Sequence, residues 1–186
     1  MIALAAVAVG IAANAASISW ATTKGYLYDG TGDSAPKLTS GTAYLVLSSY
    51  AQSDLVSLLA SKDGDTVATL TALQGNAAYL GIGTIGENAR ITGTGTTSAT
   101  DSITAYFVVF NGNNMYISDT ATSDYDGLAQ AHDLTFGTSM TASSKALPSD
   151  GAYSGAGWYT QSVPEPTSGL LLLLGVAGLA LKRKRA

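Results

Sequence analysis

The clearest alternation of side chains lies at residues 102–110 and predicts a central β-strand. Odd-numbered residues from 103 to 109 fall on one face, and even-numbered residues from 104 to 110 fall on the other. Both faces are largely apolar near 107–110, so we expect this strand to be buried on both sides. Residues 111–114 (Asn-Gly-Asn-Asn) tolerate a positive φ, and residues 115–118 alternate again, which together predict a β-hairpin.

The remaining pattern predicts a body made mostly of short strands. The next clearest strand is 41–48, then 17–21 and 25–28, with weaker strands at 67–72, 89–94, 134–136 and 157–160. One helix is predicted at 55–60, with Ser53 as its N-cap and Asp63-Gly64 at its end. We therefore expect an all-β body, either an antiparallel β-sandwich or a small barrel, with one short helix.

The N-terminus has the pattern of a signal peptide at residues 1–15. Residues 2–13 form an apolar run that is too short to span a bilayer well, and Ala13 and Ala15 flank Asn14 in a small-x-small cleavage site. The pattern predicts export by the Sec translocon and cleavage by signal peptidase after Ala15, leaving a body at 16–161. No lysine or arginine precedes the run, which leaves a start upstream of Met1 open. A buried N-terminal helix is the alternative.

The C-terminus, residues 162–186, has the pattern of a membrane anchor. Pro164 and Pro166 hold the backbone extended and cannot continue a helix. An apolar segment at 168–181 predicts one transmembrane helix, which spans only about 22 Å at about 1.5 Å per residue and needs its flanking basic residues to complete the crossing. Those four residues should stay on the cytoplasmic side of the membrane; they are Lys182, Arg183, Lys184 and Arg185. A buried hydrophobic hairpin is the alternative.

This tail resembles the PEP-CTERM protein-sorting family. The family pattern is a Pro-Glu-Pro motif, a short hydrophobic helix and a basic end, which correspond here to Pro164-Glu165-Pro166, 168–181 and 182–185. The resemblance implies that an exosortase, a membrane protease-transpeptidase, recognises the motif from Val163 to Pro166 and removes the helix after secretion. It also implies the envelope of a Gram-negative bacterium that makes exopolysaccharide. It covers only the tail, so it implies nothing about residues 16–162.

Charge and composition exclude several classes of function. The chain before Val163 has five basic residues and twelve acidic residues, whereas the tail has four basic residues and one acidic residue. An acidic body opposes binding to nucleic acid, which needs a basic surface. The chain has no cysteine and a single histidine, which excludes disulfides, a cysteine-ligated zinc site and a site with several histidine ligands.

Two motifs could suggest an enzyme, but each lacks the context that its chemistry needs. Gly81, Gly83 and Gly86 match a dinucleotide-binding fingerprint, yet no helical pattern follows them to hold a pyrophosphate, so we expect turn glycines. His132 and Asp133 could join a serine in a catalytic triad, but the Gly-x-Ser-x-Gly elbow is absent. We expect His132 to lie in a loop or at a strand edge, with a local hydrogen bond.

Acidic turn residues are the candidates for a cation site. Asp124 and Asp126, with Asp119 and Asp133 nearby, could supply oxygen ligands to calcium, and Asp63-Gly64-Asp65 is a second candidate. Aspartate and glycine are also ordinary turn residues, and the twelve-residue calcium loop is absent. We therefore expect no cofactor and no resident metal, with calcium as the alternative.

Aromatic residues raise the alternative of a carbohydrate-binding module. Trp20 and Trp158 lead a set that could stack on the sugar rings of an exopolysaccharide, and the set also contains Tyr26, Tyr28 and Tyr159. The same residues could instead fill the core. No pair of placed carboxylates indicates a glycosidase, so a hydrolase is less favoured. We expect a secreted or envelope-associated structural or matrix protein that is not an enzyme.

Overall fold

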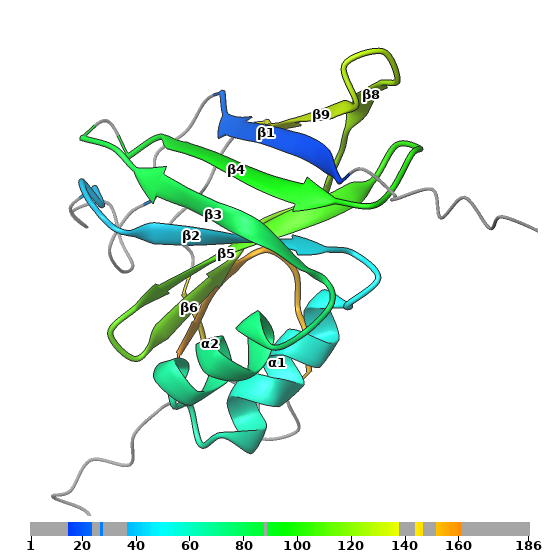
Figure 1. Ribbon diagram of the computed structural model, residues 1–186. Helices are drawn as coiled ribbons and strands as arrows, with labels where there is room; N and C mark the ends of the chain where they lie inside the picture. The colour runs from blue at the N-terminus through cyan, green and yellow to red at the C-terminus, as the bar shows by residue number, and fades with distance from the viewer. Residues whose placement is uncertain are drawn as a thin grey trace, which may run out of the picture.

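The computed structural model describes residues 15–23, 27, 37–87, 89–137, 144–146 and 152–160 (Figure 1). The strands are β1 (Ala16–Thr22), β2 (Thr42–Leu47), β3 (Tyr79–Ile85), β4 (Ile91–Thr97), β5 (Thr104–Asn111), β6 (Asn114–Ile117), β7 (Ala121–Thr122), β8 (Asp124–Asp126), β9 (Ala131–Phe136), β10 (Ser144–Ala146) and β11 (Gly157–Thr160). The helices are α1 (Gln52–Ser61) and α2 (Thr66–Gln74).

The strands form one sheet in the order β10-β11-β6-β5-β2-β3-β4-β1-β9-β8, and β7 pairs with β5. The sheet curls into a half-barrel (Figure 1). The body is thus mostly β, as expected, and closer to the barrel than to the sandwich. The sheet is not wholly antiparallel, because β1 pairs with β9, and β10 with β11, in parallel.

Strand β5 is buried on both faces, as its alternation predicted. Ala105, Phe107 and Val109 belong to the cluster inside the curl of the sheet, together with Trp20. On the opposite face Tyr106 and Val108 pack in a second cluster, which includes residues of both helices. The predicted hairpin is also confirmed, because Asn111 pairs with Asn114 across a turn in which Gly112 has a φ of 55°.

Glycines allow β3 and β4 to pass closely beneath Trp20. Gly83 pairs with Gly93, and a Cβ added at Gly83 would lie 2.6 Å from Cζ2 of Trp20. A Cβ at Gly93 would overlap the pyrrole side of the same indole. The expectation that Gly81 and Gly83 are turn residues is therefore wrong, since both lie within β3. A strand glycine that permits close backbone approach explains their pattern better than a nucleotide site.

Residues 67–72, expected as a strand, lie in helix α2 instead. The carboxylate of Asp65 accepts hydrogen bonds from the backbone N–H groups of Val67 and Ala68, each at 2.9 Å, and so caps the helix. The buried residues Thr66, Thr69 and Leu73 follow helical spacing and bind the helix to the sheet. Valine and threonine favour strands in isolation, and this cap and burial outweigh that preference.

Other local predictions met mixed outcomes. Helix α1 extends beyond 55–60 and has Ala51 rather than Ser53 at its N-cap, but it ends before Asp63 and Gly64 as expected. These two residues have φ values of 52° and 75°, which a helix cannot continue. The predicted strands at 17–21, 41–48, 89–94, 134–136 and 157–160 correspond to β1, β2, β4, β9 and β11. Of the strand expected at 25–28, only Leu27 is described.

Candidate functional site

The sorting residues predicted from the sequence lie outside the described part of the chain. This holds for Val163 to Pro166, for the helix expected at 168–181 and for the basic residues 182–185. Among the residues that are described, no helix has the length and apolarity needed to cross a membrane. Of the expected signal peptide only Ala15 is described; it directly precedes β1, whose first residue, Ala16, is buried.

Both tryptophans proposed as a glycan platform are in the core, so the expectation that they are exposed is wrong. Trp20 and Trp158 are each 2% exposed. Trp20 stacks on Phe107 with ring centroids 5.9 Å apart, and Trp158 meets Tyr116 edge-on at 5.4 Å. Tyr159 is also buried, and its hydroxyl donates to the carbonyl of Gly155 at 2.6 Å. Packing inside the half-barrel therefore accounts for these rings, while Tyr26 and Tyr28 lie outside the described residues.

His132 is fully buried in β9 and not in a loop or at an exposed edge, which corrects the expectation. Its Nε2 lies 3.1 Å from the carbonyl oxygen of Ala99, and its Nδ1 lies 3.1 Å from Oγ of Ser123. Because a carbonyl only accepts, Nε2 carries the proton and Nδ1 accepts from the serine hydroxyl. Oγ of Ser123 in turn accepts from the N–H of Ile103 at 3.0 Å.

This cluster is structural rather than catalytic in its geometry. Ser123 separates β7, which pairs with β5, from β8, which pairs with β9, so the cluster joins the two arms of the sheet. Asp133 follows His132 in the strand and points to the opposite, exposed face. The triad considered from the sequence therefore does not assemble, because Asp133 points away from His132, and His132 and Ser123 are both buried.

The aspartates proposed for calcium lie at an exposed hairpin. Asp126 accepts hydrogen bonds from the backbone N–H groups of Leu128 and Ala129, at 2.9 and 3.3 Å, and so holds the turn between β8 and β9. Asp124 is opposite Asp133 on the neighbouring strand. Within the described residues there is no group of three or more histidine, cysteine or acidic side chains arranged to hold a metal.

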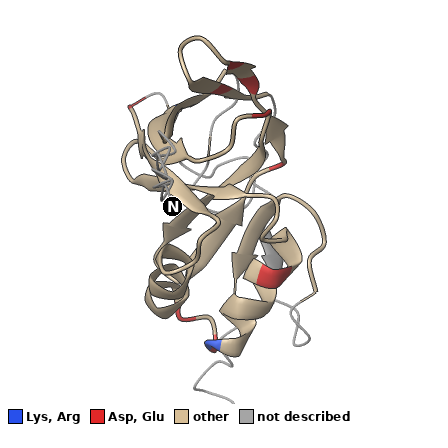
Figure 2. Cartoon of the chain, turned by 45° about the vertical axis from the view of Figure 1, so that its right-hand side comes forward, with Lys and Arg blue, Asp and Glu red and all other residues tan. Residues whose placement is uncertain are grey.

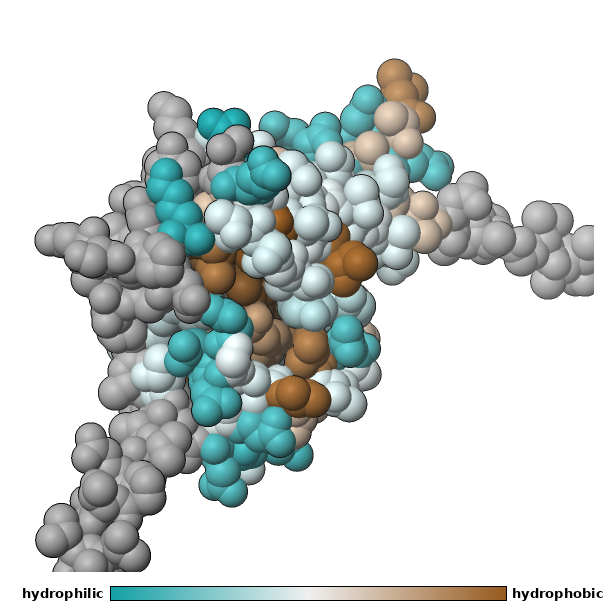
Figure 3. All heavy atoms as spheres, turned by 90° about the vertical axis from the view of Figure 1, so that its left-hand side faces the viewer, coloured by the Kyte–Doolittle hydropathy of each residue, from teal (hydrophilic) through white to brown (hydrophobic). Residues whose placement is uncertain are grey.

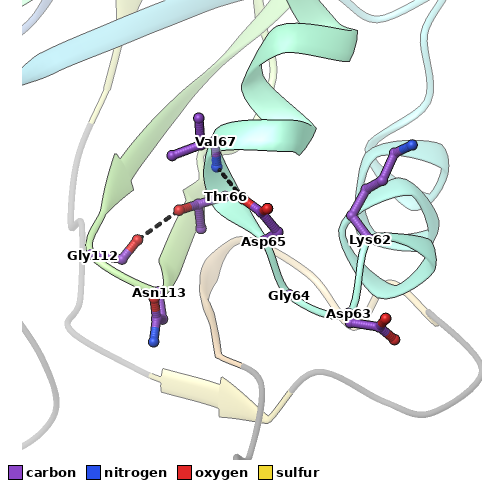
Figure 4. Close-up of a pocket in the computed structure, with 8 residues that line it drawn as sticks. All are labelled: Lys62, Asp63, Gly64, Asp65, Thr66, Val67, Gly112 and Asn113. Atoms are coloured by element: carbon purple, nitrogen blue, oxygen red, sulfur yellow. Dashed lines mark hydrogen bonds between the residues drawn. The ribbon is translucent and has the colours of Figure 1, made fainter.

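An open pocket of about 590 Å³ lies where the α1–α2 turn meets the β5–β6 hairpin (Figure 4). It contains the second acidic candidate, Asp63-Gly64-Asp65, beside Lys62. Asp65 is already engaged as the cap of α2, and the hydroxyl of Thr66 donates to the carbonyl of Gly112 at 2.7 Å. Asp65 thus stabilises the start of α2, and Thr66 connects this helix to the β5–β6 hairpin.

Sequence reasoning missed a partly exposed row of aromatic side chains on the outer face of the sheet. Tyr79, Tyr44 and Phe110 come from the neighbouring strands β3, β2 and β5. The ring of Tyr44 lies 6.5 Å from that of Tyr79 and 5.9 Å from that of Phe110. We call these three residues the aromatic row. Strand alternation could have revealed this row, because it places Tyr44 on the face opposite to that of its neighbours Ala43 and Leu45.

Comparison with known proteins identifies the tail. No curated protein and no solved structure matches the chain. Residues 162–185 match the family model described as the PEP-CTERM protein-sorting motif, and no family model accounts for the body. The chain therefore carries a PEP-CTERM sorting motif at its C-terminal end, the signal by which an exosortase sorts a secreted protein to the cell envelope.

Proposed function

We propose that this protein is a structural component of the envelope or extracellular matrix of a Gram-negative bacterium. The signal peptide directs export, the C-terminal helix holds the chain in the membrane, and an exosortase-type transpeptidase cuts near Val163–Pro166. The β-rich body is then the functional product, and it acts without catalysing a reaction. The observation that carries this proposal is the sorting motif at residues 162–185.

The chemistry of the tail suits the recognition step. Pro164 and Pro166 have no backbone N–H and fix φ, so the peptide between body and membrane presents an extended backbone to a protease. Glu165 supplies the one negative charge of the tail. Lys182 to Arg185 hold the following helix with its basic end in the cytoplasm, which places the motif on the outer side of the membrane.

The described body supports a role without catalysis. His132 is the only histidine of the chain, and both of its ring nitrogens are engaged in the contact between the arms of the sheet. The hydroxyl of Ser123 is buried with it. A triad serine must be open to substrate, and its histidine is oriented by a carboxylate. Here Ser123 and His132 are both buried, and the second partner of His132 is the carbonyl of Ala99.

The intact mass of the protein from envelope and medium tests the sorting proposal. We expect the mature wild-type protein to begin near Ala16 and to end near Pro166, with or without the mass of an attached group. Substitution of Pro164-Glu165-Pro166 by alanines should leave a membrane-bound species that retains residues 170–186. The matched control is Glu87→Gln, which changes the only other glutamate of the chain at an exposed position. Normal release of the alanine variant would refute the proposal.

A further inference from the structure

The aromatic row lies on the same side of the sheet as the helices but extends beyond the part that they cover. Tyr44 pairs with Val108 of β5, and Val108 belongs to the cluster beneath the helices. Since residues directly opposite one another share a face, Tyr44 points to that side. Phe110 packs against the edge of the same cluster. Tyr79 pairs with Val46 of β2, which belongs to the same cluster.

The row continues into an exposed apolar and hydroxylated surface. Ile82 is opposite Tyr44 and is 52% exposed. Its partner on β4 is Thr94, and the partner of Thr94 on β1 is Ser19; both are exposed. Figure 3 looks along the strands from the side where β2 begins and β5 ends, and hydrophobic residues lie in the middle of this view among neutral and hydrophilic ones.

This surface carries no charge, although the body is acidic. None of the residues of β1 to β6 or of α2 is charged. Figure 2 shows the acidic residues outside the central strands, at the β8–β9 hairpin, in loops between strands, and on and beside the helices. A charged ligand would find no counter-ion on this surface and would be desolvated without compensation. An anionic chain would also be repelled by the net negative charge of the body.

We propose that the aromatic row binds a neutral polysaccharide chain. The axial C–H faces of pyranose rings are apolar and stack on aromatic rings, while the sugar hydroxyls at the ring edges form hydrogen bonds. The row supplies three rings on adjacent strands, and the hydroxyls of Tyr44, Tyr79 and Thr94 supply donors and acceptors.

The tilt of the rings selects the shape of the glycan. Tyr44 is inclined by 44° to Tyr79 and by 60° to Phe110. A flat crystalline polysaccharide needs coplanar rings, whereas successive sugars of a single chain turn relative to one another. The row therefore fits a soluble, twisted chain better than a crystalline surface.

Binding can be tested with the full chain, purified in a detergent that has no sugar headgroup. The neutral probes are mixed-linkage β-glucan, galactomannan and dextran; the anionic probe is polygalacturonate, and crystalline cellulose is the flat surface. We expect at least one soluble neutral probe to bind. Tyr44→Ala should weaken that binding by about fivefold, since removing a stacked ring costs on the order of 1 kcal/mol. Tyr79→Ala should have a similar effect.

Leu128→Ala is the matched control, because Leu128 is fully exposed at the distant β8–β9 hairpin, and this variant should bind as the wild type does. Tyr44→Phe keeps the ring and should lose less affinity than Tyr44→Ala, which separates stacking from misfolding. No binding to any neutral probe would overturn the proposal. So would a preference for polygalacturonate or cellulose, unchanged binding by both alanine variants, or a row that mediates only self-association in sedimentation experiments. Because binding is measured on purified protein, its outcome is independent of tail processing.

Discussion

Replacing Gly83 by alanine tests how Trp20 is held in the curled sheet. The added methyl group would lie 2.6 and 2.7 Å from Cζ2 and Cη2 of Trp20, and 2.9 Å from the carbonyl oxygen of Thr92. Ordinary contact begins at 3.4 Å, so the indole must recede by about 0.8 Å. Phe107 and Phe136 contact the indole, each with its ring centroid 5.9 Å away, and they oppose this movement.

Overpacking of a buried site costs about 1–3 kcal/mol, and the rigid neighbours place Gly83→Ala near the upper end. With a urea slope of about 1–3 kcal/mol/M, the midpoint of unfolding of the processed protein should fall by roughly 1–2 M. The matched control is Gly137→Ala, because a Cβ at Gly137 meets nothing within 4 Å and its φ is not positive. This control should remain within about 0.5 kcal/mol of the wild type.

A double-mutant cycle identifies the indole as the cause. In a Trp20→Leu background the methyl group at position 83 meets a smaller side chain, so the cost of Gly83→Ala should fall by at least about 1 kcal/mol. The contact with the carbonyl of Thr92 persists in both backgrounds, so it accounts for the cost of Gly83→Ala that remains in the Trp20→Leu variant. If Gly83→Ala unfolds at the same urea concentration as Gly137→Ala, then Trp20 does not lie against Gly83 and the account of the curl is wrong.

Two further predictions concern the described body. His132→Ala removes the hydrogen-bond partner of Ala99 and Ser123, and it should lower the free energy of unfolding by about 1–3 kcal/mol for each buried group left unsatisfied. Asp133→Asn, on the exposed face, should change that free energy by no more than about 0.5 kcal/mol. Equal urea midpoints for the two variants would contradict the structural role of His132. Burial raises the pKa of Tyr153 to about 12 and that of Tyr106 and Tyr116 further still. Because the fold favours the neutral phenols, their contribution is fully present below about pH 10, the unfolded value, and is lost as pH rises through the folded values. Urea midpoints should therefore fall above about pH 10, less so in Tyr116→Phe, and equal midpoints at about pH 8 and pH 11.5 would contradict this reasoning.

The sequence predicts well the elements that depend mainly on their own local pattern of apolar, polar and turn residues. Strand β5 has two apolar faces because a hydrophobic cluster lies on each side of it. The turn after it requires a residue that tolerates a positive φ, such as Gly112, independently of the rest of the fold. The sorting motif is equally local, since it consists of contiguous residues, and the family model matches it at 162–185. Such features depend little on distant contacts.

The remaining features depend on residues far apart in the sequence. Strand β3 was missed because Gly83 makes room for Trp20 of β1, and Gly81 allows close approach of the β4 backbone. Helix α2 depends on the cap at Asp65 and on burial against the sheet, and its own composition resembles a strand. The exposure of an aromatic residue is likewise a property of the sheet: Trp20 and Trp158 are inside the curl, and Tyr44 is outside it.

The aromatic row should bind a ligand at a lower cost in conformational entropy because its residues lie on strands rather than in loops. Tyr44 is held between β3 and β5, Phe110 packs against the cluster beneath the helices, and Tyr79 pairs with Val46 of β2. Side chains that are already ordered lose little conformational entropy when a ligand binds, so even weak stacking contributes to affinity. If the tail is cleaved as proposed, the row would give the body a means of association with the envelope that does not depend on the tail. Sorting by the tail and retention by the row would then act in succession on one chain.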